Sequence, residues 1–334
     1  MNVLVLNFKK SIFSFLSIAF IICLLLFSNS NIKAAQEGLN LWASSVVPVL
    51  FPFFIATELL YCTNLVSFLE KYCSKFMKNI FNLSGISVFP IIMGTISGYP
   101  TGAKIVSNLR NDRKISKTEG EHLLAFTNNS GPLFILGTVG ISIFCDSKIG
   151  ILLLITHILG SFTVGFIFKF WKPNRTNLFV NSNNLSNNDK FNLGTIIINS
   201  ISKSITTILN IGGFIVLFSV IISILEKSNF LEIISNFFMP FGFSETIIQS
   251  FFTGILELTN GIKNLSIVGT KNLNEIIIIS AFLLGFGGFS VVLQVYSIIS
   301  KSDLSIKPYI VGKILHGFIS AFYTIILLNV LKIY

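Results

Sequence analysis

The sequence predicts an all-α protein that crosses the membrane several times and contains two inverted-topology repeats, each with a broken or re-entrant helical hairpin. Of the 334 residues, 52% are hydrophobic and only 11% are charged, whereas a soluble domain carries roughly 25% charged residues. The charges are clustered, which leaves apolar runs of about 20 residues, long enough to cross the hydrocarbon layer. Short motifs also recur in the same order, about 156 to 160 residues apart. This composition excludes a soluble enzyme.

The N-terminal segment, residues 1–35, predicts a membrane anchor helix. Its apolar run, residues 12–27, is long for the core of a signal peptide, and further membrane segments follow, which favours a retained helix. A weak cleavage site at Lys33–Gln36 keeps a cleaved signal peptide as the alternative. Residues 36–45 then predict an interfacial helix with Trp42 at headgroup depth.

The first repeat, residues 36–172, contains apolar segments that are interrupted by helix-breaking residues. One of them is broken at Gly98-Tyr99-Pro100 and has basic loops on both sides. A single crossing would place one strongly basic loop outside, so a re-entrant hairpin is the favoured interpretation. The predicted segments are 46–61, 88–107, 123–144 and 149–170.

A polar, Asn-rich linker is predicted for residues 173–200, because this stretch has few large apolar residues. The second repeat, residues 201–334, has the same layout as the first. Its predicted segments are a span at 205–225, an interfacial helix at 230–243, a broken segment at 247–268, a Gly-rich segment at 276–300 and a last span at 309–331.

The distribution of basic residues predicts that the two repeats are inverted. With the N-terminus inside, sixteen of the 24 Lys and Arg residues fall in inner loops and five in outer segments. The first hairpin then lies on the inside and the second on the outside. Inverted repeats with interrupted helices at matching positions are typical of secondary transporters, whose binding site lies near the bilayer midplane.

Ionisable side chains inside apolar segments indicate a structural or functional role, because each costs about 2.5–3.5 kcal/mol at membrane depth. Lys104 and Lys263 follow the two hairpin breaks at matching positions and predict a cationic pair suited to a carboxylate; snorkelling to the interface is the alternative. Glu257 precedes the second break, either as a salt-bridge partner of these lysines or as a ligand of solute or ion. Glu58, at the end of a span, either meets water or has a role in the site.

Further polar residues at the breaks complete the candidate site. The cluster at residues 127–130 either ends a helix for structural reasons or binds the solute or a coupling Na⁺. His157 and His316 are related by the repeat, and a helix-packing hydrogen bond is favoured over a proton relay. The candidate substrate-binding residues are Ser97, Gly98, Tyr99, Thr101, Lys104, Asn128, Asn129, Ser130, Glu257, Thr259, Asn260, Lys263, Ser290 and Gln294.

Enzymatic and nucleic-acid functions are not expected. The sequence has no P-loop, GxSxG or HExxH motif, and its His and Cys residues lack the spacing of a metal site. The net charge of +10 resides in short loops, which predicts membrane orientation and no binding of nucleic acid. The expected partners are a small anionic solute and the lipid bilayer; a homo-oligomer is compatible with the sequence. No cofactor is expected, and coupling to Na⁺ or H⁺ is left open.

Several motifs together resemble a known family. These are Trp42, the Pro-Val-Leu-Phe-Pro-Phe-Phe run at residues 48–54, the Ser-Gly-Tyr-Pro-Thr-Gly-Ala-Lys run at 97–104, residues 129–135 and residues 287–291. They resemble the sporulation integral membrane protein YlbJ family. That family contains the nucleoside-recognition Gate domain, shared with concentrative nucleoside transporters, which implies two Gate-type repeats here.

The resemblance implies a role in spore formation. It implies an endospore-forming bacterium and movement of dipicolinic acid across the outer forespore membrane, with effects on the spore cortex. Dipicolinate is a flat dianion, so we hypothesise that Lys104, Lys263 and helix N-termini bind its charges, while Tyr99 packs on its ring and residues 128–130 bind its edges. The alternatives are a nucleoside or nucleobase carrier and a non-transporting membrane organiser of sporulation.

Overall fold

The structure, a computed structural model, describes residues 2–63, 65–171, 193–242, 244–268 and 273–331. Within these ranges all regular structure is helical and no strand occurs, which confirms the predicted all-α class. In the same ranges, four helices are long and apolar enough to cross a membrane, and six spans result if each of two bent pairs counts as one. The protein is therefore a multi-pass membrane protein. The four spans are Ser147–Phe168, Leu193–Lys227, Leu273–Ile299 and Lys307–Val330.

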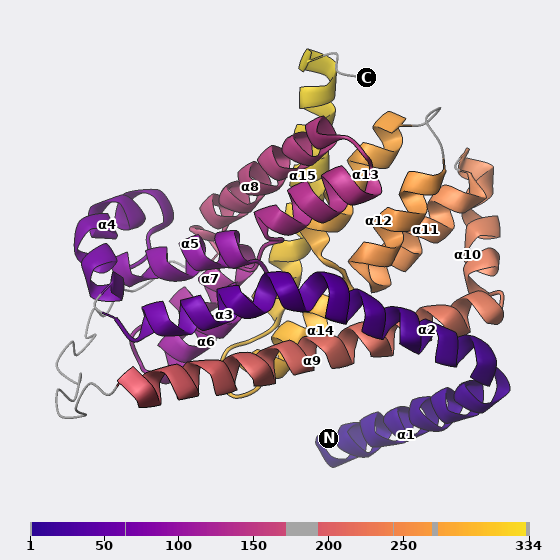
Figure 1. The fold of residues 1–334 in the computed structure, drawn as a ribbon, viewed down its shortest axis with the longest axis horizontal. Helices are drawn as coiled ribbons and strands as arrows, with labels where there is room; N and C mark the ends of the chain where they lie inside the picture. Colours follow the sequence, from indigo (N-terminus) through magenta and orange to yellow (C-terminus); the bar gives the residue numbers. More distant parts are fainter. Residues whose placement is uncertain (1, 64, 172–192, 243, 269–272, 332–334) are drawn as a thin grey trace.

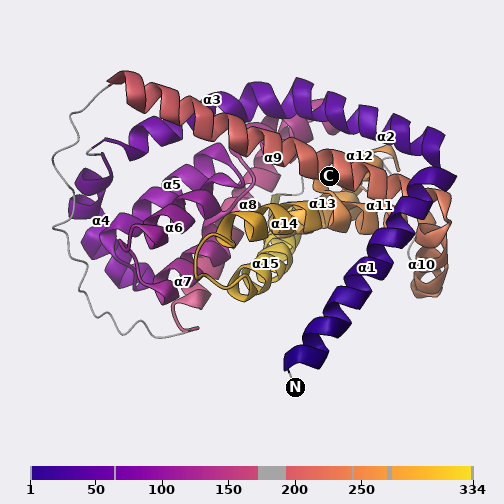
Figure 2. The same cartoon turned by 90° about the horizontal axis from the view of Figure 1, so that it is seen from below.

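The N-terminal helices are sharply bent and only partly joined to the rest. Helix α1 (Asn2–Leu26) projects away from the bundle (Figure 2), while α2 (Ser28–Leu41) lies along α9 (Leu193–Lys227). The two are bent by 99°. Trp42, just after α2, donates its indole N–H to the Ile208 carbonyl at 3.0 Å. The expected interfacial helix thus packs on protein, and the headgroup depth of Trp42 stays a prediction.

The first half contains the predicted interrupted segments and one helix that the sequence analysis missed. Residues 71–78 were treated as a basic loop, but Lys71, Lys75 and Lys78 are spaced along the exposed face of an amphipathic helix, α4. The helices are α3 (Val47–Tyr61), α4 (Leu65–Phe81), α5 (Val88–Ser97), α6 (Thr101–Asn111), α7 (Lys117–Thr127), the π-helix η3 (Phe134–Ile143) and α8 (Ser147–Phe168).

The second half repeats this order of elements. An apolar helix (α3 or the much longer α9) is followed by a hairpin (α5–α6 or α11–α12), an interrupted helix (α7–η3 or α13–α14) and a long helix (α8 or α15). The bounds are α10 (Phe230–Phe238), α11 (Glu245–Leu256), α12 (Leu258–Ile267), α13 (Leu273–Phe286), α14 (Gly288–Ile299) and α15 (Lys307–Leu331). The opposite orientation of the two halves in the membrane stays a prediction.

The predicted linker is shorter than expected. Residues 173–192 lie outside the described residues, but residues 193–200, also assigned to the linker, form the first turns of α9. The sequence from Leu193 onward is rich in Ile, so its apolar side chains extend the long helix. The prediction was wrong for this part because the Asn-rich composition ends before residue 193.

Both hairpins are tight because small residues meet where their helices cross. A Cβ atom added to Gly94 of α5 would lie 3.0 Å from the Gly102 Cα atom of α6. In the second hairpin, a Cβ atom on Gly261 would overlap the Gly254 Cα atom. Helices α11 and α12 accordingly lie side by side (Figure 1). The predicted helix–break–helix arrangement of both segments is confirmed, whereas their re-entry from one membrane side stays a prediction.

The two halves interlock around α8 and α15. These helices pack on each other, and each also packs on α7 and α13. The His157 and His316 rings lie 4.5 Å apart at this contact, and His316 Nε2 donates to the His157 carbonyl at 2.8 Å. The predicted helix-packing hydrogen bond is confirmed for His316. Each of the two main core clusters contains buried apolar side chains from both halves, so the halves are packed together through a common core.

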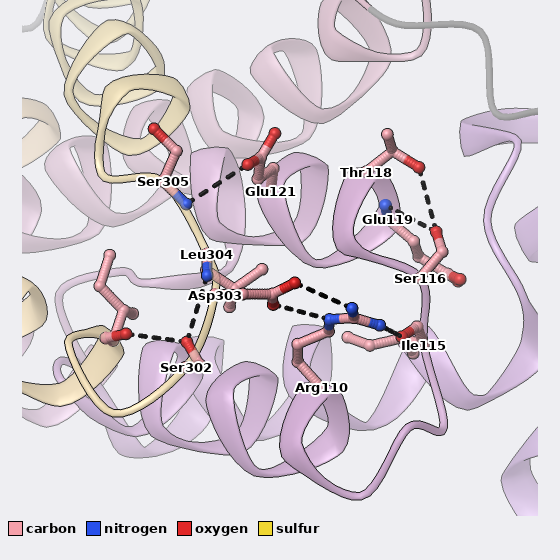
Figure 3. A network of polar contacts seen from close by, with 11 residues as sticks. Arg110, Ile115, Ser116, Thr118, Glu119, Glu121, Ser302, Asp303, Leu304 and Ser305 are labelled. Atoms are coloured by element: carbon pink, nitrogen blue, oxygen red, sulfur yellow. Dashed lines mark hydrogen bonds and ion pairs between the residues drawn. The ribbon is translucent and has the colours of Figure 1, made fainter.

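A polar network also joins the first hairpin to the second half (Figure 3). Arg110, at the end of α6, donates from Nε and Nη2 to the two carboxylate oxygens of Asp303, at 2.8 and 2.9 Å. Its third nitrogen, Nη1, donates to the Ile115 carbonyl at 3.1 Å. The Arg110 guanidinium lowers the pKa of Asp303 below its ordinary value. This bidentate pair fixes the position of the α14–α15 loop against the end of α6.

Substitution of Gly261 by Ala should destabilise the protein, because the new methyl group overlaps α11. We expect a loss of about 1–3 kcal/mol, typical of overpacking, measured as a lower thermal unfolding midpoint in detergent. Gly213→Ala in α9 is the matched control, since nothing lies within 4 Å of its added Cβ atom. Equal midpoints for the two variants would contradict the close packing.

Asp303→Asn should lower the unfolding midpoint slightly near neutral pH, because Arg110 then loses its anionic partner. A carboxylate whose pKa is lowered by folding stabilises the protein above its unfolded pKa of about 3.9, and this contribution is lost as the pH falls through the lower folded value. The difference between wild type and variant, followed by thermal unfolding from neutral to acidic pH, should therefore vanish in acid. A difference that persists there would contradict the assigned ion pair.

Candidate functional site

The breaks in the helices occur where glycine adopts a backbone conformation that other residues rarely adopt. Gly98 has φ +80° after α5, and Gly287 has φ +86° between α13 and α14. Asn128 and Asn129 lie between the end of α7 and η3. These positions agree with the interruptions that the sequence predicts, at Gly-Tyr-Pro, Asn-Asn-Ser and Gly-Phe-Gly-Gly.

A cavity of about 90 Å³ lies where the two hairpin breaks and α14 meet. The first hairpin contributes residues 97–99, the second contributes residues 257 and 259, and α14 contributes residues 290 and 294. Apolar side chains of η1 (Trp42–Val46), α3 and α9 close the other side. Seven predicted site residues therefore share one cavity although they come from both halves: Ser97, Gly98, Tyr99, Glu257, Thr259, Ser290 and Gln294.

Glu257 is the one ionisable carboxylate that lines this cavity, and it is buried. It accepts hydrogen bonds from the backbone N–H groups of Thr259 at 3.1 Å and Asn260 at 2.8 Å. Glu257 thus caps α12 and occupies the helix N-terminus that the sequence analysis offered to an anionic solute. The described residues contain no ion pair between Glu257 and either of the predicted lysines.

A second and larger cavity, about 390 Å³, adjoins the first and shares Ile211 and Gln294 with it. We call it the vestibule; its basic lining residues are Lys104, Lys203 and Lys301. It also holds polar side chains of α6 and α9, together with Asp112. The vestibule therefore combines a polar wall with an excess of positive charge.

Lys104 is held by a buried carboxylate in the vestibule wall. Its Nζ atom lies 2.8 Å from Glu58 Oε1 and donates to Thr207 Oγ1 at 2.9 Å. Lys203 Nζ lies 3.6 Å from the other oxygen of Glu58. Glu58 is only 8% exposed, so it belongs to the site and is not a helix end in water. One carboxylate facing two ammonium groups leaves a net positive charge here.

Lys263 is exposed and lines neither cavity. The two lysines occupy matching positions in the sequence, but Lys104 contacts α9 whereas Lys263 is on the exposed face of α12. The structure therefore does not bring them together as a cationic pair. Matching sequence positions have different surroundings because the helices packed around each hairpin differ.

The Asn-Asn-Ser cluster is buried behind the cavity and does not line it. The amide of Asn129 donates to the Phe126 carbonyl and to Ser161 Oγ, both at 3.0 Å. The Ser130 N–H donates to His157 Nε2 at 3.0 Å. These contacts stabilise the helix break, which is the structural one of the two roles considered for this cluster. Thr101 is likewise buried outside the cavity, and Asn260 contributes its N–H to Glu257.

A buried lysine that the sequence analysis did not select lies next to this cluster. Lys313 of α15 is 1% exposed. Its Nζ atom donates to the Asn128 carbonyl at 3.1 Å and lies 3.3 Å from His316 Nδ1. The available signal was a lysine within an apolar run, but no break lies beside it in the sequence. In the described part of the chain, no group of three His, Cys, Asp or Glu side chains is arranged to hold a metal ion.

The arrangement of interrupted helices around a cavity agrees with a comparison of the sequence with protein families. Residues 43–170 and 208–302 match the Gate family, described as nucleoside recognition. This chain is a member of the Gate family. The matched ranges include both hairpins, both interrupted helices and every residue that lines the first cavity except Leu41. The chain is also 34% identical over 317 residues to the sporulation integral membrane protein YlbJ of Bacillus subtilis strain 168, covering 89% of this chain and 78% of that protein.

Proposed function

We propose that this Gate-family protein is a transporter that carries a small carboxylate anion across the membrane by alternating access. The observation that supports this most is the convergence of both hairpin breaks on one cavity, which has polar side chains on one side and apolar side chains on the other, next to a basic vestibule. Interrupted helices that meet inside a membrane protein are typical of transporter binding sites. The proposal includes no chemical reaction on the solute.

The positive vestibule is the feature that favours an anion. Three lysines and Asp112 line it, and Glu58 pairs with Lys104 and Lys203, so the remaining net positive charge attracts carboxylates. The inner cavity has the opposite character, since Glu257 would repel a second negative charge. A dianion with a flat ring therefore fits best with its carboxylates toward Lys104 and its ring toward Tyr99 and the apolar wall. Dipicolinate has this shape and charge, and it is the solute that the family resemblance implies.

The vestibule also suggests a direction of access. Asn111, Asp112 and Lys301 line it, and the count of basic residues assigns their loops to the inside. On that assignment, the described conformation is open to the cytoplasm of the mother cell. We propose the outer forespore membrane as the location and the forespore as the destination of the solute, by analogy with the relative named for sporulation.

A nucleoside or nucleobase carrier is the second candidate, and the inner cavity favours it. Glu257, Thr259, Ser290 and Gln294 offer hydrogen-bonding groups with no lysine among them, which suits an uncharged solute that carries hydroxyl and amide groups. The family description, nucleoside recognition, points the same way. A pure membrane organiser would need neither the cavity nor the vestibule.

Purified protein in liposomes should take up labelled dipicolinate, and unlabelled dicarboxylates should compete for uptake because the vestibule attracts two carboxylates. Nucleosides should compete weakly. Uptake that only nucleosides inhibit would replace the first candidate with the second. Protein-dependent uptake of neither solute class would contradict both.

Lys104→Gln should reduce dipicolinate uptake about tenfold or more, since a charged contact to a carboxylate typically contributes 1.5–3 kcal/mol. Lys263→Gln is the matched control and should leave uptake near the wild-type rate, because Lys263 lines neither cavity. The double variant Glu58→Gln/Lys104→Gln separates two causes. Uptake by this variant should stay slow if Lys104 attracts the solute, and should recover if the loss came only from the missing contact between Lys104 and Glu58.

A further inference from the structure

We propose that the ammonium group of Lys313 is a built-in cation that takes the place of a coupling Na⁺ at the break between α7 and η3. The inference about solute flux rests on the proposed transport function, whereas the inference about the cation position does not. Its consequence is that the protein binds no Na⁺ at this break and that solute movement does not require a Na⁺ gradient.

The helix break after α7 leaves a backbone carbonyl group that can bind a cation. After α7 the chain leaves helical geometry at Asn128, which has φ −97° and ψ 86°. The Asn128 carbonyl is then free to bind a cation. In transporters, carbonyl groups of unwound membrane helices are the groups that coordinate Na⁺. Here that carbonyl accepts a hydrogen bond from Lys313 Nζ at 3.1 Å.

The neighbouring His316 ring presents a lone pair, and not a proton, to this ammonium. His316 Nε2 lies 2.8 Å from the His157 carbonyl, which can only accept, so Nε2 carries the proton. The Nδ1 atom of the neutral ring is then an acceptor, 3.3 Å from Lys313 Nζ. His157 Nε2 likewise accepts the Ser130 N–H. The atoms that contact Lys313 are therefore of the kind that would bind a small cation.

A protonated Lys313 disfavours a second cation at the same carbonyl. Lys313 is buried, and the described residues contain no carboxylate paired with it. A Na⁺ ion on the same carbonyl would lie next to an ammonium group in a medium that screens charge poorly. The Oδ1 atoms of Asn128 and Asn129 are buried without a hydrogen-bond partner. If the ammonium were removed, the Asn128 carbonyl and His316 Nδ1 would lose their donor, and the carbonyl would be available to Na⁺.

Thermal unfolding of the purified full-length protein tests the cation position without any transport assay. The unfolding midpoint is measured in NaCl and in choline chloride at equal ionic strength. The wild type should show no Na⁺-specific shift. Lys313→Ala should be less stable in choline, and saturating Na⁺ should raise its midpoint by about 3 °C or more, because a ligand that binds only the folded state stabilises it. Lys263→Ala, which removes an exposed lysine, should show no such rise.

Two outcomes would overturn the inference: a saturable Na⁺-specific shift in the wild type, or its absence in a folded Lys313→Ala protein. If the alanine variant does not fold, Lys313→Gln and the wild-type measurement decide the question. In liposomes, wild-type dipicolinate flux should be equal with inward Na⁺ and choline gradients, and Na⁺-dependent flux would contradict the inference. Absence of flux under both gradients would count against the proposed function, while the unfolding data would still decide the cation position.

Discussion

The structure depends on one constraint: backbone groups that are freed at a helix break inside a membrane must find partners within the protein. Glu257 accepts two N–H groups at the second hairpin, His157 accepts the Ser130 N–H, and Lys313 donates to the Asn128 carbonyl. Ionisable side chains at membrane depth are costly. Here they serve as hydrogen-bond partners for the backbone groups at the helix breaks. Of these residues, Glu257 also lines the first cavity.

The sequence predicted the breaks well because their signals are local. Gly, Pro and Asn inside apolar runs mark them, and the repeated order of elements follows from the recurring motifs. It could not predict the partners, because these come from distant segments: Glu58 pairs with Lys104, and Lys313 reaches Asn128 across 185 residues. The expected equivalence of Lys104 and Lys263 failed for the same reason, since the helices around each hairpin differ.

The distribution of charge divides the site into two parts. The vestibule has several lysines, whereas the inner cavity has a single carboxylate and uncharged hydrogen-bonding groups. A solute with charge at one end and a ring at the other would enter with its ring first. Ile211 and Gln294 line both cavities, so such a solute would move past these two residues.

Helix α9 has a length that matters for how the protein sits in lipid. Its 35 residues correspond to about 52 Å at 1.5 Å per residue, whereas the hydrocarbon layer is about 30 Å thick. An apolar helix of this length accommodates the mismatch with the bilayer by a large tilt or by deforming the lipid around it. Because α9 also forms one wall of both cavities, its tilt angle would link bilayer thickness to the width of these cavities.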